Sequence, residues 1–192
     1  MTHARNLLAL AIAGLMATST MAMTKEEHKA GNDRISADYK ASKAKCDTMN
    51  GNAKDICQKE AKGAENVAKA ELEAQYKPSA KASQKVAEAK ADAEYDVAKE
   101  KCDDMTGDAK NVCQKEAKAA HVTAKENAKV ARAAATPADT TAKQQANVAE
   151  AKKDASAEKR EADYKVAKEK CDTMSGDAKD KCVADAKRMY GQ

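Results

Sequence analysis

The chain contains no phenylalanine and no tryptophan, and tyrosine is its only bulky aromatic residue. After residue 22 it has one leucine, Leu72, and two isoleucines, Ile35 and Ile56. Its 42% hydrophobic content is therefore mostly alanine. Large aliphatic and aromatic side chains supply most of the apolar area buried in a globular core. This composition excludes an ordinary globular domain with a large core.

Helix breakers and long apolar runs are also scarce. The chain has two prolines, Pro78 and Pro137, and no stretch after residue 22 is apolar enough to cross a membrane. Between the prolines lie long windows of alanine, lysine and glutamate, which are strong helix formers. Charged residues make up 34% of the chain with both signs intermixed, and the net charge is only +4. We therefore expect extended helices and no nucleic-acid partner.

Residues 1–22 are typical of a secretory signal peptide. Arg5 precedes an apolar run from Leu7 to Met16, and the stretch Thr20-Met21-Ala22 places short side chains at the positions that a signal peptidase reads. We expect cleavage after Ala22, which leaves no transmembrane anchor. The predicted location is the bacterial periplasm or the outside of the cell.

Six cysteines form three identical pairs, each bracketing a variant of one phrase: CDTMNGNAKDIC, CDDMTGDAKNVC and CDTMSGDAKDKC. A tyrosine stands seven residues before the first cysteine each time, at Tyr39, Tyr95 and Tyr164. Repetition of this kind indicates one supersecondary unit used three times. In an oxidising compartment an even, regular set of cysteines predicts disulfides. The repeat favours pairing within each unit: Cys46–Cys57, Cys102–Cys113 and Cys171–Cys182.

The middle of each phrase predicts a tight turn between two helices. Gly51, Gly107 and Gly176 suit a left-handed residue that ends the first helix. Asn52, Asp108 and Asp177 follow them and suit the N-cap of the second helix. Each unit should thus be an αα-hairpin with its two cysteines near the bend. On the second helix of the middle unit, we expect Cys113, Ala117, Ala120 and Ala124 to face the first helix.

The two prolines divide the chain after the signal peptide 1–22 into three hairpin repeats, 23–77, 78–136 and 137–192. The third repeat has a longer first arm and a short second arm. We predict an all-α fold of three tandem disulfide-stapled hairpins, coiled-coil-like and extended, with a thin alanine-rich core and flexible proline-containing linkers. Whether the hairpins stack or trail like beads is left open, as is the oligomeric state.

Three interpretations of the cysteines are compatible with the sequence. Structural staples are the first, and a reactive dithiol is a weaker one, since no C-x-x-C motif is present. The third is a soft copper(I) site in which Met49, Met105 or Met174 joins the two cysteines of its unit. The alternative role for these methionines is to close the hairpin end. No catalytic motif or phosphate-binding loop is present, so we expect no enzyme and no cofactor.

At YKVAKEKCDTMSGDAKDKC and its sister copies, the chain resembles a group of small proteobacterial exported proteins. Their repeated phrase is similar to Y-K-x-x-K-x-K-C-D-x-x-x-G-N-A-K-D-x-C, and they are sometimes labelled TolA-like or cell envelope biogenesis proteins. The resemblance covers all three units and is weakest after Cys182. It implies bacterial origin and export, and it implies no catalytic or binding residue.

The sequence thus leads to three functional hypotheses. The first is a non-enzymatic cell-envelope protein that acts as a periplasmic spacer, scaffold or protein-interaction module. The second is a periplasmic copper or thiol-stress buffer that uses the Cys-Met-Cys sets. The third is a chaperone-like helper or one that binds envelope polymers. The partners we expect are envelope proteins or envelope polymers.

Overall fold

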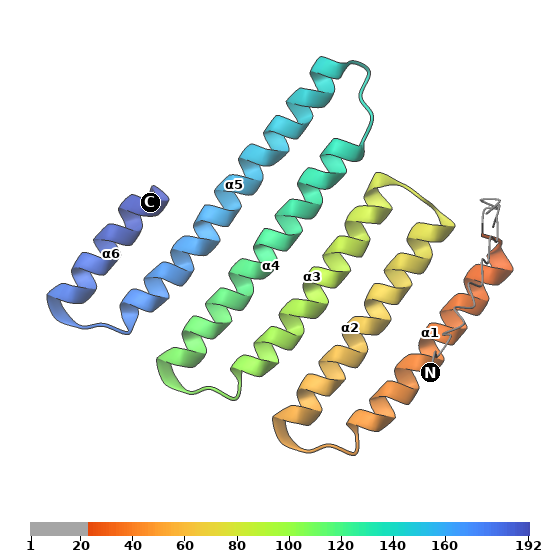
Figure 1. Ribbon diagram of the computed structural model, residues 1–192, viewed down its shortest axis with the longest axis horizontal. Helices are drawn as coiled ribbons and strands as arrows, with labels where there is room; N and C mark the ends of the chain where they lie inside the picture. Colours follow the sequence, from red (N-terminus) through yellow and green to blue (C-terminus); the bar gives the residue numbers. More distant parts are fainter. Residues whose placement is uncertain (1–22) are drawn as a thin grey trace, which may run out of the picture.

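The computed structural model describes residues 23–192, which form six α-helices (Figure 1). The helices are α1 (Lys25–Cys46), α2 (Gly51–Tyr76), α3 (Ala80–Cys102), α4 (Gly107–Ala135), α5 (Thr141–Asp172) and α6 (Gly176–Tyr190). The predicted signal peptide, residues 1–22, lies outside the described residues. Among residues 23–192, no helix combines the length and the apolar character that a membrane crossing requires.

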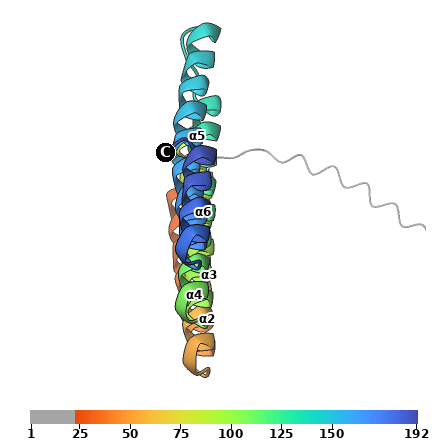
Figure 2. The ribbon, with the colours of Figure 1, turned by 90° about the vertical axis from the view of Figure 1, so that its left-hand side faces the viewer.

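The helices lie side by side in one layer. Each helix of the described chain packs only against its neighbours in sequence, from α1 against α2 to α5 against α6 (Figure 1). Seen edge-on, the array is one helix thick (Figure 2). Both broad faces of this six-helix layer are therefore exposed, and no residue within 23–192 is enclosed by helices on all sides.

Hydroxyl side chains start three of the helices. Thr24 forms a capping box with Glu27 at the start of α1, while Ser79 and Thr140 accept hydrogen bonds from Ala82 and Lys143 at the starts of α3 and α5. Such caps satisfy backbone N–H groups that have no partner within the helix. These residues fix where α1, α3 and α5 begin.

The core consists of small residues. The buried apolar residues among those described are Cys46, Ala61, Ala82, Ala91, Cys102, Ala119, Ala128, Ala155, Ala162, Cys171 and Ala186. Alanine lets helix backbones approach closely but removes little apolar area from water. The predicted thin alanine-rich core is thus present, and the first cysteine of each pair is its most buried member, at most 1% exposed.

Four of the six helices bury two opposite sides, because each has a neighbour on either side. Ala120, expected to face the first helix of its hairpin, is exposed, whereas Ala119 is buried toward α5. The prediction for Ala120 was wrong because it assigned α4 a single partner. The alanine stripe of α4 is divided between α3 and α5.

The hairpins stack, which answers the question that the sequence left open. Pro78 lies between α2 and α3, Pro137 lies between α4 and α5, and both helix pairs pack along each other. The Nζ atom of Lys90 on α3 lies 2.7 Å from a carboxylate oxygen of Glu71 on α2. The proline segments are therefore short connections between packed helices, more constrained than the flexible linkers expected.

Candidate functional site at the hairpin ends

Each hairpin is closed by a disulfide at the predicted pair of cysteines. The Cα–Cα distances are 5.4 Å for Cys46–Cys57, 5.7 Å for Cys102–Cys113 and 5.5 Å for Cys171–Cys182. These distances are ordinary for a disulfide between neighbouring helices. All six cysteines are bonded within their own unit. The same covalent closure thus recurs three times along one edge of the layer (Figure 1).

The turn differs from the prediction in its register. Gly51, Gly107 and Gly176 have φ values of 59°, 57° and 58°, which is the left-handed region that favours glycine. They are nevertheless the first residues of the second helices, and the preceding residues Asn50, Thr106 and Ser175 hold the N-cap positions. The first helix of each hairpin ends four or five residues before its glycine. There the N–H of a methionine (Met49, Met105 or Met174) bonds to the carbonyl of the first cysteine, three residues back.

The predicted N-cap role of Asn52, Asp108 and Asp177 was therefore wrong. These residues lie one position inside the second helix. The side chain of Asn52 instead donates a hydrogen bond to the carbonyl of Glu100, 2.9 Å away on α3. Asn52 thus connects the first hairpin to the second.

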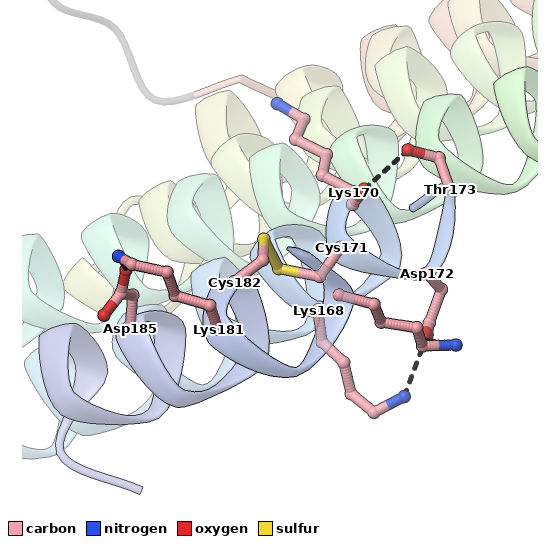
Figure 3. Close-up of a disulfide and its surroundings, with 9 residues drawn as sticks. Lys168, Lys170, Cys171, Asp172, Thr173, Lys181, Cys182 and Asp185 are labelled. Atoms are coloured by element: carbon pink, nitrogen blue, oxygen red, sulfur yellow. Dashed lines mark hydrogen bonds and ion pairs between the residues drawn. A yellow bond between two sulfur atoms is a disulfide. The ribbon is translucent and has the colours of Figure 1, made fainter. Parts of the chain in front are cut away.

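An aspartate directly after each first cysteine pairs with a lysine beyond the bend, and Asp47 and Asp172 also pair with a lysine before it. Asp172 accepts a hydrogen bond from Lys168, before the bend, and lies 2.9 Å from Lys179, after it (Figure 3). Asp47 is placed in the same way, 3.0 Å from Lys43 and 3.5 Å from Lys54. We call this repeated feature the aspartate clamp; its three aspartates are Asp47, Asp103 and Asp172.

The clamp lysines change the acidity of these aspartates. The pKa of each clamp carboxyl lies below its ordinary value, and the largest cause is a hydrogen bond from a lysine. The lysine is Lys43 for Asp47, Lys110 for Asp103 and Lys179 for Asp172. A carboxylate bonded to a cation favours its charged form. The clamps are therefore fully charged at neutral pH, and they bridge the bend beside each disulfide.

Each turn also presents a methionine to solvent. The exposed fractions of Met49, Met105 and Met174 are 43%, 44% and 47%. The backbone N–H of each donates to the carbonyl of the first cysteine of its unit at 3.0 Å. These methionines close the first helix through the backbone, while their side chains remain at the surface.

The copper(I) hypothesis depends on the redox state of the cysteines. Copper(I) prefers thiolate and thioether ligands, and a disulfide withdraws both thiolates of a unit. Among residues 23–192, no cluster of three histidine, cysteine or acidic side chains has a metal-binding arrangement. A copper role would therefore require the reduced protein, and it stays a prediction.

The tyrosine of each repeat packs against the other arm of the hairpin. The Nζ atoms of Lys62 and Lys118 lie 5.3 Å from the ring centroids of Tyr39 and Tyr95, respectively. Tyr164 instead meets Tyr190, with ring centroids 6.5 Å apart. Each contact closes its hairpin about two turns above the disulfide, at a site that the cysteine spacing did not reveal.

Two histidines bridge the arms of their hairpins in the same manner. His28 stacks on Tyr76 with ring centroids 4.4 Å apart, and its Nε2 lies 3.2 Å from Glu73. His121 stacks on Tyr95 at 4.7 Å, and its Nε2 lies 2.6 Å from Asp92. In both cases the acid precedes the tyrosine by three residues, which places acid and ring on one side of their helix. Sequence reasoning missed this pattern because the two histidines occupy different positions of the repeat.

Glu65 and Glu126 are buried acids that sequence reasoning also missed. Glu65 is 7% exposed and accepts hydrogen bonds from Lys62 and Lys69 at 2.8 and 2.6 Å. These bonds, that from Lys62 first, lower the pKa of Glu65. Glu126 is 6% exposed and bonds to Lys129. The lysines neutralise both carboxylates. We therefore interpret Glu65 and Glu126 as part of the packing between helices.

One open groove lies over the third disulfide. It has a volume of about 510 Å³ and is bordered by Cys171, Cys182, Met174, Met189 and Tyr190. Its wall is almost entirely apolar, and its charged neighbours Lys181 and Asp185 are paired with each other at 3.0 Å. The groove holds no arrangement of an acid, a base and a nucleophile.

Comparison of the chain with protein-family models, with curated proteins and with solved structures gives no match in any of the three.

Proposed function

We propose that this protein is a non-enzymatic, exported component of the bacterial cell envelope, in which three stapled hairpins form a rigid spacer or protein-interaction surface. The observation that carries the proposal is the repeated disulfide hairpin packed into a single layer. A layer one helix thick offers two broad faces to other molecules (Figure 2). Repeat proteins commonly use such extended surfaces for binding.

The disulfides support a location outside the cytoplasm. Structural disulfides form and persist in oxidising compartments and are rare where thiols are kept reduced. All six cysteines are used in this way, and each bond closes its own hairpin. Periplasmic export through residues 1–22 is part of the proposal.

The dimensions suit a spacer. At the helical rise of 1.5 Å per residue, the 32 residues of α5 span about 48 Å. Neighbouring hairpins are joined along their length and also by polar contacts, such as Lys59–Glu100 at 3.4 Å and Lys170–Glu116 at 2.6 Å. The array should therefore move as one body. We propose envelope proteins or envelope polymers as its partners.

Site-specific photo-cross-linking in intact bacteria tests the proposal. A photoreactive residue is placed at exposed positions of the middle hairpin, such as Asp104 and Lys99. The matched control carries the same probe with Cys102→Ala and Cys113→Ala. We expect one envelope partner to be captured from several positions, and capture to fall when the staple is removed.

Cell fractionation with thiol alkylation before lysis supplies the second half of the test. The proposal requires a periplasmic chain with no alkylated cysteine, and a chain without residues 2–22 that remains in the cytoplasm with reactive thiols. A full-length chain found in the cytoplasm with six free thiols would contradict it. So would the absence of any cross-linked partner in the envelope.

A chaperone-like role is a second candidate, favoured by one observation. The exposed large hydrophobic residues of the described chain are all methionines: Met49, Met105, Met174 and Met189. Methionine is flexible and polarisable, and it recurs at surfaces that bind many partners. The test is suppression of aggregation of an unfolded periplasmic protein. Wild type should protect the client, and a variant with serine at all four positions should not; equal protection by both would contradict this role.

A further inference from the structure

The contacts between hairpins, α2 with α3 and α4 with α5, use the same positions of the repeat; we call each a joint. A small residue six positions after the second cysteine faces a small residue nine positions before the next first cysteine. In the first joint these are Gly63 and Ala93, which nearly touch. In the second they are Ala119 and Ala162, both 8% exposed and bordering one narrow cavity. Both joints thus place a small residue opposite a small residue, at the same positions of the repeat.

Each joint has two sides, which we call the donor side, on α2 and α4, and the accepting side, on α3 and α5. The donor side has a second requirement. The residue before the second cysteine is β-branched and aliphatic, Ile56 in α2 and Val112 in α4. It lies seven positions before Gly63 or Ala119, so two helical turns place both on one side of the helix. The donor side therefore combines an aliphatic residue and a small residue.

The third hairpin departs from this pattern on its outer side. The same two positions of α6 carry Lys181 and Arg188. Asp185, between them, pairs with both, at 3.0 Å from Lys181 (Figure 3). We call these three residues the closing triad. Ion-paired charges thus occupy the positions where the joints have aliphatic and small side chains.

The first helix, α1, carries the other half of a joint, and none of the other helices within residues 23–192 packs on this half. The accepting side consists of the positions 16, 9, 5 and 2 residues before the first cysteine. In α5 these positions are Ala155, Ala162, Val166 and Glu169, whereas in α1 they are Ala30, Ala37, Ala41 and Ala44, which are all exposed. Because α1 runs in the same direction as α3 and α5 (Figure 1), a second copy's α6 would meet α1 as α2 meets α3.

We propose that the closing triad prevents α6 from docking on α1 of a second copy, and so limits the array to three hairpins per molecule. Docking would bring Arg188 to a place that admits only glycine or alanine. It would also remove the charges of Lys181 and Asp185 from water against the alanines of α1, which is unfavourable. This inference concerns self-assembly and does not rest on the proposed function.

Two substitutions convert α6 to the donor pattern of α4. In the variant Lys181→Val, Arg188→Ala, the two positions match Val112 and Ala119. Sedimentation velocity over a range of concentrations compares this variant with wild type. We expect wild type to sediment as a monomer, and the weight-average mass of the variant to rise at least twofold with concentration.

Matched variants identify the surface involved. Ala37→Lys, added to the double variant, should restore the monomer because it obstructs the accepting side of α1. Lys187→Val with Arg160→Ala removes the same charges at exposed positions outside the joint pattern and should leave the protein monomeric. Far-UV circular dichroism and a thiol count establish that each variant is folded. If valine in α6 reduces helicity, the variant Lys181→Ala, Arg188→Ala replaces the first double variant.

The outcomes separate clearly. A folded double variant that remains monomeric at every concentration would overturn the proposal. Association that Ala37→Lys does not reverse would also overturn it, because another surface would then be responsible. A wild-type protein that already associates through Ala37 would show that the triad does not close the array.

Discussion

Gly63 of α2 lies so close to Ala93 of α3 that a Cβ atom built on Gly63 would stand 2.6 Å from the Cβ of Ala93. It would also stand 3.3 Å from the Ala93 Cα. This approach joins the first two hairpins, and α3 cannot yield by a side-chain rotation because alanine has none. A helix-interior glycine, ordinarily unfavourable, is required here by packing.

A pair of glycine substitutions tests this contact. Gly63→Ala should lower the free energy of unfolding by about 1–3 kcal/mol, because the new methyl group forces α2 and α3 apart. Gly31→Ala is the matched control: its new methyl group would meet only the flexible end of Leu72. That substitution should raise stability by about 0.5–1 kcal/mol, since alanine is the better helix former. Chemical denaturation followed by circular dichroism measures both. Equal effects of the same sign would argue against a tight joint at Gly63.

Removal of one staple should be costly. Cys102→Ala with Cys113→Ala should lower the free energy of unfolding by about 3 kcal/mol, the value expected for a closed loop of this length. The thin alanine core contributes little compensating burial. Thermal denaturation with and without reductant measures the effect; reduction should lower the melting temperature of wild type and leave the fully Cys→Ala variant unchanged. If the helicity of the wild type were the same with and without reductant at every temperature, the staples would be dispensable.

The aspartate clamps predict a loss of stability in acid. Because lysine hydrogen bonds lower the pKa of Asp47, Asp103 and Asp172 in the folded protein, their contribution is complete above about pH 4. It is lost as pH falls through the lowered folded-state values. The triple Asp→Asn variant should melt at a lower temperature than wild type at pH 7, and the difference should shrink below pH 4. The effect is small, since the clamps are exposed to solvent. A difference that persists undiminished at pH 2 would count against the clamps.

The middle hairpin should also depend on His121. His121→Ala removes the stack on Tyr95 and the contact with Asp92, and it leaves a gap between α3 and α4. Burial raises the pKa of Asp92, but the bonds to His121 and Lys125 outweigh it and give a net lowering. We expect a loss of about 1–3 kcal/mol in the free energy of unfolding. His121→Phe, which keeps the stack alone, should recover part of it. A neutral His121→Ala would mean that the arms are held by the disulfide and alanine contacts only.

Residue spacing was sufficient for the hairpin and its staple. The interval between paired cysteines and the glycine between them predicts an αα-hairpin, and the structure has the disulfides and the positive φ of Gly51, Gly107 and Gly176. The N-cap assignment to Asn52 failed by two positions. The glycine begins the second helix rather than ending the first, and no rule based on residue type alone distinguishes these positions.

The joints between hairpins could not be read from hydrophobic periodicity. The side of α4 that meets α5 carries Lys115, Ala119 and Val122, a pattern that is also typical of a solvated helix face. Repeat comparison does contain the signal: Gly63 and Ala119 are small at one position of the repeat, and Arg188 is not. Only the knowledge that hairpins pack side by side gives that difference a meaning.

Small-angle X-ray scattering of residues 23–192 tests most directly whether the three hairpins form one rigid layer. The scattering curve should match the one-helix-thick array, with a Kratky plot that rises to a peak and returns toward the baseline. Gly63→Leu should lengthen the molecule by opening the first joint. A Kratky plot that climbs to a plateau in wild type, typical of beads on flexible linkers, would contradict the layer.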